Sequence, residues 1–500
     1  MDRDQVAARA ADAPSPSSSH SSRPARWRSL RAHPLVVYGP LALAVGAYAA
    51  WFITLSMRMY DGYNYPPFDL SIFDQGLWLL SHGHSPFVTI MGRSLFGDHT
   101  SFILLPLVVI YRLFPEPQGI LVLQTLVLAS AALPIFLIAR RRLSSLWQAS
   151  ALAVAFLASP ILQQGNLDQF HPEAIQVLVI SWALYGALEW RPTLLAVTVL
   201  LALMVKEDAV MLVLPLTVRV ALRRDRGTGV ALGIAALVWA YLANYWVIPG
   251  YLHASSFYAG RLPFGGVHGT LATLLHAPGA FFSYLASQGR PFYLWQLGAT
   301  VGFVFLANPE IAAVGVLVAF ENVLSNDVYM HQILYQYSLP LVPVLVVGAT
   351  IGVARLRRAR WRAAAVVVTL VAALWTSAVW GFLPFSVNRV VAYQSTSARA
   401  ALSALEARIP PDASVCAWYP LVAHLDNRVS IYVWPTPFSA QNWGLFDTTG
   451  QWLARSRTVR YLLLPSVLDA STNLDVFERI VAHFSVVESR GGFTLYRRRY

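Results

Sequence analysis

Residues 191–224 read RPTLLAVTVLLALMVKEDAVMLVLPLTVRVALRR, and this stretch decides the topology of the chain. Arginines close both ends, and Lys206, Glu207 and Asp208 are three adjacent charges near the middle of the run between them. A single long helix would place three adjacent charges in the middle of a bilayer, at a cost of several kcal/mol. We therefore predict two short membrane helices in a hairpin, with residues 206–208 at an external turn and both ends in the cytoplasm.

The composition of the whole chain is that of a membrane protein. Of its 500 residues, 56% are hydrophobic and 12% are charged, and the mean hydropathy is +0.51. The net charge of +12 comes from short arginine runs between apolar stretches, without a motif that reads nucleic acid. No nucleic-acid partner is therefore expected. The single cysteine, Cys416, excludes an internal disulfide and a multi-cysteine metal site.

The N-terminal region divides into a tail and a first anchor. Residues 1–33 are rich in Ala, Ser, Pro and Arg, which predicts a disordered basic tail in the cytoplasm. Residues 34–55 form an apolar run long enough to cross a bilayer. No small-residue cleavage pattern follows this run, so we expect it to remain as the first membrane helix.

The arginine runs fix the direction of the other spans, because cytoplasmic loops are rich in arginine. With residues 140–142 inside, only one of the two preceding apolar runs can cross, and we assign the crossing to 120–139. The run 101–114 is bounded by prolines and is predicted to lie on the outer membrane surface. Residues 56–119 then form one long external loop.

The remaining spans alternate in direction along the chain. They are predicted at 147–163, 174–190, 230–248, 292–307, 311–324, 339–354 and 363–383. The predicted fold class is thus an all-α polytopic protein of the bacterial inner membrane, with about 11 transmembrane helices. Residues 34–383 form its membrane domain, in contact with the lipid bilayer.

Residues 384–500 differ in character from the membrane domain. Their apolar runs are of strand length and are separated by Pro, Asp, Asn and Gly, which predicts a small extracytoplasmic α/β domain. A helix is predicted at 397–408, and strands are predicted at 413–417, 429–434, 461–464 and 493–497.

Acidic, histidine and lysine side chains gather near the external membrane boundary. They are Asp61, Asp69, Asp74, His82, His84, Asp98 and His99 in the first loop, Asp168, His171 and Glu173 in the second, Lys206, Glu207 and Asp208 in the hairpin turn, and Asp327 and His331 further on. Buried charges need counter-charges. We therefore predict one outer-face cavity lined by Asp69, Asp98 or His99, His171 and Lys206.

Several of these residues allow two interpretations. The stretch FDLSIFDQGLWLL at 68–80 holds Asp69 and Asp74, and helical spacing splays the two carboxylates by about 140°, so they serve different partners. Both could also be ordinary helix-start residues. Lys206, the only lysine among 37 Lys and Arg residues, suits a phosphate oxygen, or else an ion pair at the membrane boundary.

A divalent cation such as Mg²⁺ or Mn²⁺ is one candidate cofactor. The residues of suitable type for it are Asp98, His99, Asp168, His171 and Glu173. The same side chains could instead cap helix N-termini. No Walker motif, dinucleotide fingerprint or nucleophile elbow is present, so ATP-driven, redox and serine-hydrolase chemistry lack support in the sequence.

From about residue 34 to the C-terminus, the chain resembles a large bacterial family of predicted multipass membrane proteins of unknown function. The motifs that carry the resemblance are residues 68–80, FGDHTS at 96–101, Arg140 to Arg142, FHPEA at 170–174, VKEDA at 205–209, His331 with Tyr335, Tyr337 and Pro340, residues 409–417, Asn427-Arg428 and Ile431-Tyr432. That family is in turn distantly similar to the GT-C glycosyltransferases, which take a sugar from a polyprenyl-phosphate carrier and use an aspartate of the first external loop.

This resemblance implies an inverting sugar transfer from a polyprenyl-phosphate sugar donor to an extracytoplasmic acceptor, with Asp69 as the base. The substrate-binding residues that we assign are Asp74, Lys206, Glu207, Asp208 and His331. The DxD-type pair of metal-dependent relatives is absent, because Asp69 and Asp74 are five residues apart, which leaves the metal dependence open.

Two other classes of function compete with the enzyme. A transporter or flippase of a lipid-linked or polar substrate would use the charged residues as a binding site, but such proteins often show internal repeats, and this sequence shows none. A membrane-anchored scaffold would use residues 384–500 as a binding domain. Sugar transfer by the full chain distinguishes the enzyme from both.

Overall fold

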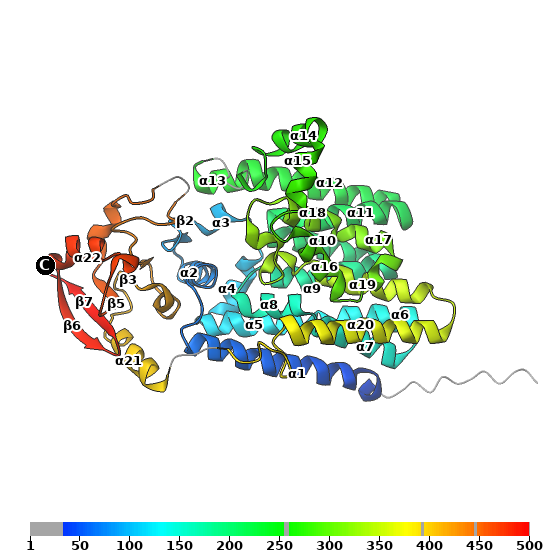
Figure 1. The fold of residues 1–500 in the computed structure, drawn as a ribbon, viewed down its shortest axis with the longest axis horizontal. Helices are drawn as coiled ribbons and strands as arrows, with labels where there is room; N and C mark the ends of the chain where they lie inside the picture. Colours follow the sequence, from blue (N-terminus) through cyan, green and yellow to red (C-terminus); the bar gives the residue numbers. More distant parts are fainter. Residues whose placement is uncertain (1–33, 255–259, 392–394, 445–447, 500) are drawn as a thin grey trace, which may run out of the picture. The chain divides into compact units, whose positions relative to one another are not determined.

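The computed structural model describes residues 34–254, 260–391, 395–444 and 448–499 (Figure 1). The predicted N-terminal tail lies outside these residues. The chain divides into two units, residues 1–39 and 40–500. In the first unit, residues 34–39 are helical and begin helix α1 (Pro34–Asp61).

Helices form most of the chain up to residue 380. After α1 and the first loop they are α5 (Pro117–Ser130), α6 (Ala132–Leu143), α7 (Leu146–Leu157), α8 (Pro160–Asp168), α9 (Glu173–Glu189), α10 (Pro192–Val205), α11 (Val210–Arg223), α12 (Arg226–Leu242), α13 (Ile248–Leu252), α14 (Val267–His276), α15 (Pro278–Leu285), α16 (Arg290–Ala299), α17 (Pro309–Ala312), α18 (Val316–Leu324), α19 (Leu341–Arg355) and α20 (Ala359–Trp380).

Fewer helices than predicted are long enough to cross a membrane. Among the described residues, five helical stretches are long and apolar enough to cross a membrane. They are Pro34–Asp61, Pro117–Leu143, Arg226–Leu252, Gln336–Arg355 and Ala359–Trp380. Helices α7 and α8, bent by 41°, make a sixth if they form one span. The predicted number of about 11 crossings is therefore not confirmed. The predicted span 292–307 is broken at Gly302 and Phe303, whose φ angles are 60° and 58°.

The predicted break in the apolar run of residues 191–224 is confirmed, whereas the two membrane crossings and the external position of the turn stay predictions. Helix α10 ends at Val205, the short 3₁₀ helix η1 (Glu207–Ala209) makes the turn, and α11 begins at Val210. The three charged residues lie at this turn and not inside a helix. Their position follows from the cost of burying adjacent charges in an apolar helix.

The helices expose large apolar side chains, as expected of a protein surrounded by lipid. Trp246 is 69% exposed on the segment after α12, Trp375 is 71% exposed on α20 and Leu222 is 77% exposed on α11. Soluble proteins rarely expose so many large apolar side chains on adjoining surfaces. The exposure agrees with the composition, and both identify the bilayer as the main solvent of this part of the chain.

The first external loop is folded and not extended. It holds α2 (Leu70–Ser81), an antiparallel hairpin of β1 (Phe87–Val88) and β2 (Arg93–Ser94), α3 (Leu95–Asp98) and α4 (Leu104–Tyr111). Helix α4 confirms the helix predicted within 101–114, and its exposed Val109 leads on to the exposed Leu113 and Phe114. This apolar face suits the membrane surface that we predict for it.

The C-terminal region has the predicted α/β character. It contains α21 (Thr396–Glu406), β3 (Val415–Ala417), β4 (Ile431–Val433), β5 (Tyr461–Pro465), α22 (Leu474–Ile480), β6 (Phe484–Arg490) and β7 (Phe493–Arg498). The five strands are ordered β4-β3-β5-β7-β6, with β3 parallel to β4 and β5, and β7 antiparallel to β5 and β6. Strand β6 and helix α22 were not predicted.

The two faces of this sheet pack against different cores. Val415 and Leu463 belong to a buried cluster that also contains Leu70 and Leu77 of α2. Cys416 and Leu462, their immediate neighbours in the chain, belong to a second cluster around α22. Successive side chains of a strand point to opposite faces of its sheet, which explains why neighbouring residues belong to different clusters. The sheet therefore packs on the first external loop.

Buried hydrogen bonds join the loop to the sheet domain. The Gln75 Nε2 group donates to the Arg428 carbonyl over 3.1 Å, and the Thr89 hydroxyl donates to the Ile431 carbonyl over 2.7 Å. The Ile431 N–H donates back to the Thr89 hydroxyl over 2.9 Å. Because Gln75 and Thr89 are buried, losing these bonds would leave polar groups unsatisfied. The contacts fix residues 428–431 against α2.

Candidate functional site

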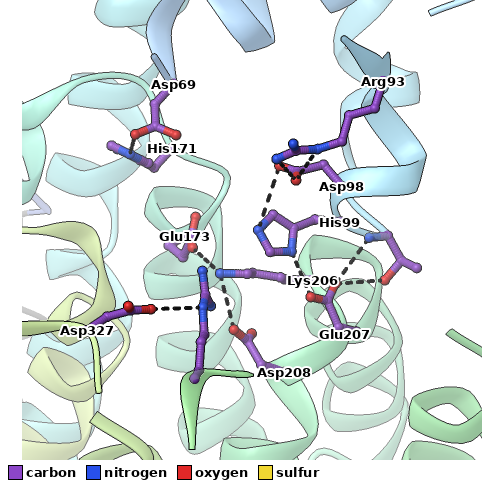
Figure 2. A network of polar contacts seen from close by, with 12 residues as sticks. Asp69, Arg93, Asp98, His99, His171, Glu173, Lys206, Glu207, Asp208 and Asp327 are labelled. Atoms are coloured by element: carbon purple, nitrogen blue, oxygen red, sulfur yellow. Dashed lines mark hydrogen bonds and ion pairs between the residues drawn. The ribbon is translucent and has the colours of Figure 1, made fainter. Parts of the chain in front are cut away.

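Asp69 forms an ion pair with His171 at the start of α2. The Asp69 Oδ2 atom lies 3.3 Å from the His171 Nε2 atom, and Figure 2 shows the two side chains directed toward each other. Asp69 is the N-cap residue of α2, and His171 lies between α8 and α9. The pair therefore joins residues of the two loops that we predict to be external.

The charge of His171 is stabilised by its surroundings. Burial disfavours the imidazolium, but the carboxylates of Asp69, Asp168 and Glu173 outweigh this cost and raise the pKa of His171 to about 9. His171 is therefore cationic at neutral pH. An imidazolium beside Asp69 fixes the direction of a carboxylate that is itself 41% exposed.

Lys206 lies at the centre of a second group of charges. Its ammonium is 2.9 Å from Glu173 Oε1 and 3.2 Å from Asp208 Oδ2. It also lies 5.6 Å from the centre of the Tyr337 ring. Burial disfavours the charge of Lys206, but Asp208 and Glu173 outweigh it and raise its pKa. The lysine is thus ion-paired, as one of the two interpretations of the sequence predicted.

A third group links the first loop to the hairpin turn. The His99 Nδ1 atom is 2.7 Å from Glu207 Oε1, and Arg93 Nη2 is 2.6 Å from Asp98 Oδ1. The Thr100 N–H donates to Glu207 Oε2 over 3.1 Å. Burial opposes the ionisation of Glu207, but His99 and Lys206 outweigh it and lower the pKa of Glu207 to about 2. Glu207 is therefore ionised at neutral pH.

The three groups adjoin one another. Glu173 follows His171 by two residues and contacts Lys206, and Glu207 follows Lys206 directly in the chain. Figure 2 shows Glu173 and Lys206 between the Asp69–His171 pair and the Asp98–His99 pair. The charges of both Asp69 and Lys206 also act on the Tyr337 phenol. The residues predicted to line one cavity are thus brought into one network.

The sheet domain also contributes a residue near Asp69. Tyr419 lies in η8 (Tyr419–His424), and its side chain is partly exposed. Burial and the Asp69 carboxylate both raise the pKa of the Tyr419 phenol. A neutral phenol can donate a hydrogen bond to a substrate. No signal in the sequence marks this residue, because nothing there relates Tyr419 to Asp69.

An amphipathic cavity of about 350 Å³ adjoins the network. Its polar lining includes Asp208, Arg261 and Glu321, and its apolar lining includes Leu317 and Phe320. Arg261 lies 3.3 Å from Asp327 in an ion pair. A lining that combines charged and apolar groups suits the head of an amphiphile. Sequence reasoning missed Arg261 and Glu321, because Arg261 lies outside the motifs and Glu321 lies within a predicted span.

Two of the predicted substrate-binding residues lie elsewhere. Asp74 is buried in α2 and faces Asp426 and Tyr111, so Asp74 and Asp69 have different partners, although Asp69 itself lies outside the helix. His331 is also buried, and its neighbours are Arg290 and backbone groups. Neither side chain belongs to the network around Lys206. Their predicted contact with substrate has no support in this geometry.

The predicted metal ligands are divided between the groups. Asp98 and His99 lie with Arg93 and Glu207, whereas His171 lies with Asp69. Among the residues that the structure describes, no cluster of three or more His, Cys, Asp or Glu side chains could hold a metal ion. The described geometry gives the predicted cation no ready-made site, and a requirement for Mg²⁺ or Mn²⁺ stays a prediction.

Solved structures show where this fold occurs. The crystal structure of ArnT from Cupriavidus metallidurans bound to undecaprenyl phosphate aligns with a TM-score of 0.55 and 14% identity, over 92% of this chain and 98% of that chain. ArnT from the same organism in the apo state gives a TM-score of 0.54 and 13% identity over the same shares. At this identity the likeness shows a shared GT-C-like fold.

The sequence of the chain places it in a protein family. No curated protein matches it. A family model described as "Predicted membrane protein (DUF2079)" matches residues 62–479, which include every residue of the network described above. The match confirms the resemblance drawn from the motifs. The chain therefore belongs to the DUF2079 family of predicted membrane proteins.

Proposed function

We propose that this protein is a membrane glycosyltransferase that moves a sugar from a polyprenyl-phosphate carrier to an extracytoplasmic acceptor, with inversion at the sugar. The observation that carries the proposal is the half-exposed Asp69 carboxylate, held by a buried imidazolium in the network that adjoins the amphipathic cavity. The fold shared with ArnT, which has been solved with undecaprenyl phosphate, supports the class of donor.

The reaction needs one base and one cationic surface. Asp69 accepts the proton of the acceptor hydroxyl as its oxygen attacks the anomeric carbon. The bond between that carbon and the phosphate oxygen breaks, and the electron pair leaves with the lipid phosphate. Arg261 and Lys206 stabilise the negative charge that develops there. No other reactant is consumed, and the products are a glycosylated acceptor and the polyprenyl phosphate.

Arg261 is the more accessible of the two cations. Its side chain is 23% exposed at the cavity, whereas the Lys206 side chain is 5% exposed and is already paired with Glu173 and Asp208. In this proposal Lys206 adds to the local positive field, and Arg261 contacts the phosphate.

The proposed orientation follows from the arginine runs. The N-terminus lies in the cytoplasm of a bacterium, and the network and the sheet domain lie outside the inner membrane. Arg140 to Arg142 and Arg223 would then mark the inner face, where Arg141 and Arg142 contact Glu189. Cysteine labelling at the exposed residues 191 and 84 from the two sides of sealed vesicles tests this orientation.

The experiment that tests the function is sugar transfer by the purified full chain in proteoliposomes. A panel of labelled polyprenyl-phosphate sugars is supplied with an envelope extract as the source of acceptor. We expect one donor to be consumed and its label to enter an acceptor. If no donor is consumed but labelled lipid moves between leaflets, the protein is a flippase and the proposal is wrong.

A further inference from the structure

Asp69 lies in a strained turn. Its backbone angles are φ 67° and ψ −72°, and the Leu70 N–H donates to the Phe68 carbonyl over 3.1 Å. These angles and this bond define the rare γ-turn with positive φ at its centre, which is strained for any residue other than glycine. A conformation of this kind persists only where neighbouring groups hold it. The groups that hold Asp69 are therefore of interest.

Two side chains of the second external loop hold the turn. The Gln169 Oε1 atom accepts a hydrogen bond from the Leu70 N–H over 3.0 Å. The His171 ring lies 3.3 Å from the Asp69 carboxylate. Gln169 thus fixes the backbone that follows Asp69, and His171 fixes its side chain. Both depend on the course of residues 169–171, which are not part of a helix or strand.

One buried carboxamide fixes those three residues at both ends. The Gln124 Nε2 group on α5 donates to the Gln169 carbonyl over 2.5 Å, and the Gln124 Oε1 atom accepts from the His171 N–H over 2.8 Å. The Gln124 side chain is buried. Its Nε2 group also donates to the Asn166 carbonyl over 3.1 Å. Only a group that donates and accepts at once can make both end contacts.

We infer that Gln124 is a positioning residue, which acts through residues 169–171 to keep the Asp69 carboxylate in its strained and reactive orientation. The catalytic part of this inference rests on the proposed function. Its structural part does not. A misplacement of about 1 Å in a reacting group can lower a rate about 100-fold, so the loss of this clamp should appear in turnover.

The matched control is Gln163 on α8. It is also buried, and its carboxamide also bonds in both directions: Nε2 donates to the Ala158 carbonyl over 3.0 Å and to the Ser377 hydroxyl over 2.9 Å, and Oε1 accepts from the Phe382 N–H over 2.8 Å. None of these partners contacts Asp69. Gln163→Ala therefore removes a comparable buried carboxamide without touching the turn.

Kinetics provide the first test. We expect Gln124→Ala to lower kcat about 10- to 100-fold with an unchanged KM for the lipid donor, and Gln163→Ala to leave kcat per folded protein unchanged. Equal kcat values for the two variants would overturn the inference.

Gln124→Glu is a second variant, which tests the inference even if Gln124→Ala fails to fold. A protonated glutamic acid can still donate to Gln169 and accept from His171, whereas the ionised form cannot donate. We expect the ratio of Gln124→Glu to wild-type turnover to be highest at about pH 5.5 and to fall as the pH rises to about 8.5, as the carboxyl group ionises. A ratio that stays flat or rises with pH contradicts the clamp.

A structure of Gln124→Ala by electron cryomicroscopy tests the inference without any assay of activity. We expect residue 69 to leave the positive-φ region and the Asp69–His171 ion pair to open. An unchanged turn in this variant overturns the inference. If the wild-type protein transfers no sugar, the proposed function fails, and this structure alone decides whether Gln124 positions Asp69.

Discussion

The Asp69 carboxylate and the His171 imidazole lie 3.3 Å apart and differ sharply in their access to solvent. The Asp69 side chain is 41% exposed, and the His171 side chain is 2% exposed. The exposed Asp69 carboxylate is accessible to a substrate, whereas the buried His171 ring holds that carboxylate in place. This division of roles matches a base and its orienting group.

Asp69→Asn keeps the shape of the side chain and removes its ability to accept a proton. We expect turnover to fall by about 10²- to 10⁴-fold while binding of the lipid donor is unchanged. Initial rates and equilibrium binding in nanodiscs measure the two effects. Asp61→Asn, an exposed aspartate at the end of α1, serves as the control and should behave as wild type. Equal rates for both variants would exclude Asp69 as the base.

The pKa of His171 predicts a loss of stability at alkaline pH. Asp69, Asp168 and Glu173 overcome the cost of burial and raise this pKa from 6.5 to about 9, so the folded protein favours the cation. The resulting stabilisation is fully present below about pH 6.5 and is lost as the pH rises through about 9. The melting temperature should therefore fall more steeply between pH 7 and about pH 9.5 in wild type than in His171→Gln. Parallel curves would contradict this account.

The sequence predicted the parts of the site that depend on local chemistry. Three charges inside an apolar run require a turn, and η1 lies there. Asp69 and Asp74 have different partners, as the sequence predicted, although Asp69 lies in a turn before α2 and not within it. In the sheet domain, β3, β5 and β7 follow from short apolar runs. Strand β6 was missed because it is an edge strand. Its neighbouring residues Val486 and Val487 are both exposed, so buried and exposed positions do not alternate there in a way that the sequence shows.

The parts that could not be predicted depend on distant pairing. Gln124 carries no charge and lies in an apolar helix, so only its two contacts with residues 169–171 reveal a role. Tyr419 is brought near Asp69 by the packing of the sheet domain on the first loop. The number of crossings stays a prediction, because apolar runs such as 311–324 fold as short, broken helices whose course through a membrane their length does not decide.

Removing one member of the Lys206 ion pairs should be costly. Lys206→Met removes the ammonium that pairs with the buried Glu173 carboxylate and with the partly buried Asp208 carboxylate. Breaking a buried pair costs about 3–5 kcal/mol, whereas an exposed pair within one helix contributes about 0.2–0.5 kcal/mol. Arg479→Met breaks such an exposed pair with Asp475 and is the control.

Thermal unfolding in detergent measures both Lys206→Met and its control. Adding Glu173→Gln to Lys206→Met should restore part of the loss, because it removes one of the uncompensated charges. A loss in Lys206→Met no larger than in Arg479→Met would show that the lysine does not stabilise the fold. Its role would then have to be sought in the binding of substrate alone.

Deleting residues 395–500 should destabilise the first external loop. Leu70 and Leu77 of α2 pack in the same core as Val415 and Leu463, and Gln75 would lose its backbone partners in the sheet domain. Hydrogen exchange in residues 70–81 should therefore rise in the truncated protein. Unchanged protection would mean that the loop folds without the sheet domain.

The contact between α2 and the sheet domain should also depend on pH. Asp74 and Asp426 are buried against each other, with Tyr111, Ser71 and Glu116 as the other polar groups that act on them. Burial raises the pKa of Asp74 to about 7, and burial together with the Asp74 charge raises the pKa of Asp426 further. At least one of the two carboxyl groups is therefore protonated at neutral pH.

Because the folded protein binds these protons more tightly than the unfolded chain, their stabilising contribution is fully present below about pH 4 and is lost as the pH rises through about 7 and above. The protection of residues 423–433 against hydrogen exchange, relative to the intrinsic exchange rate at each pH, should fall over this range in wild type. Asp74→Asn removes one titrating group and keeps a neutral partner for Asp426, so it should flatten the dependence. A variant as pH-sensitive as wild type would place the titration elsewhere, whereas a flat wild-type profile would mean that the carboxyl pair has no part in holding the sheet domain on α2.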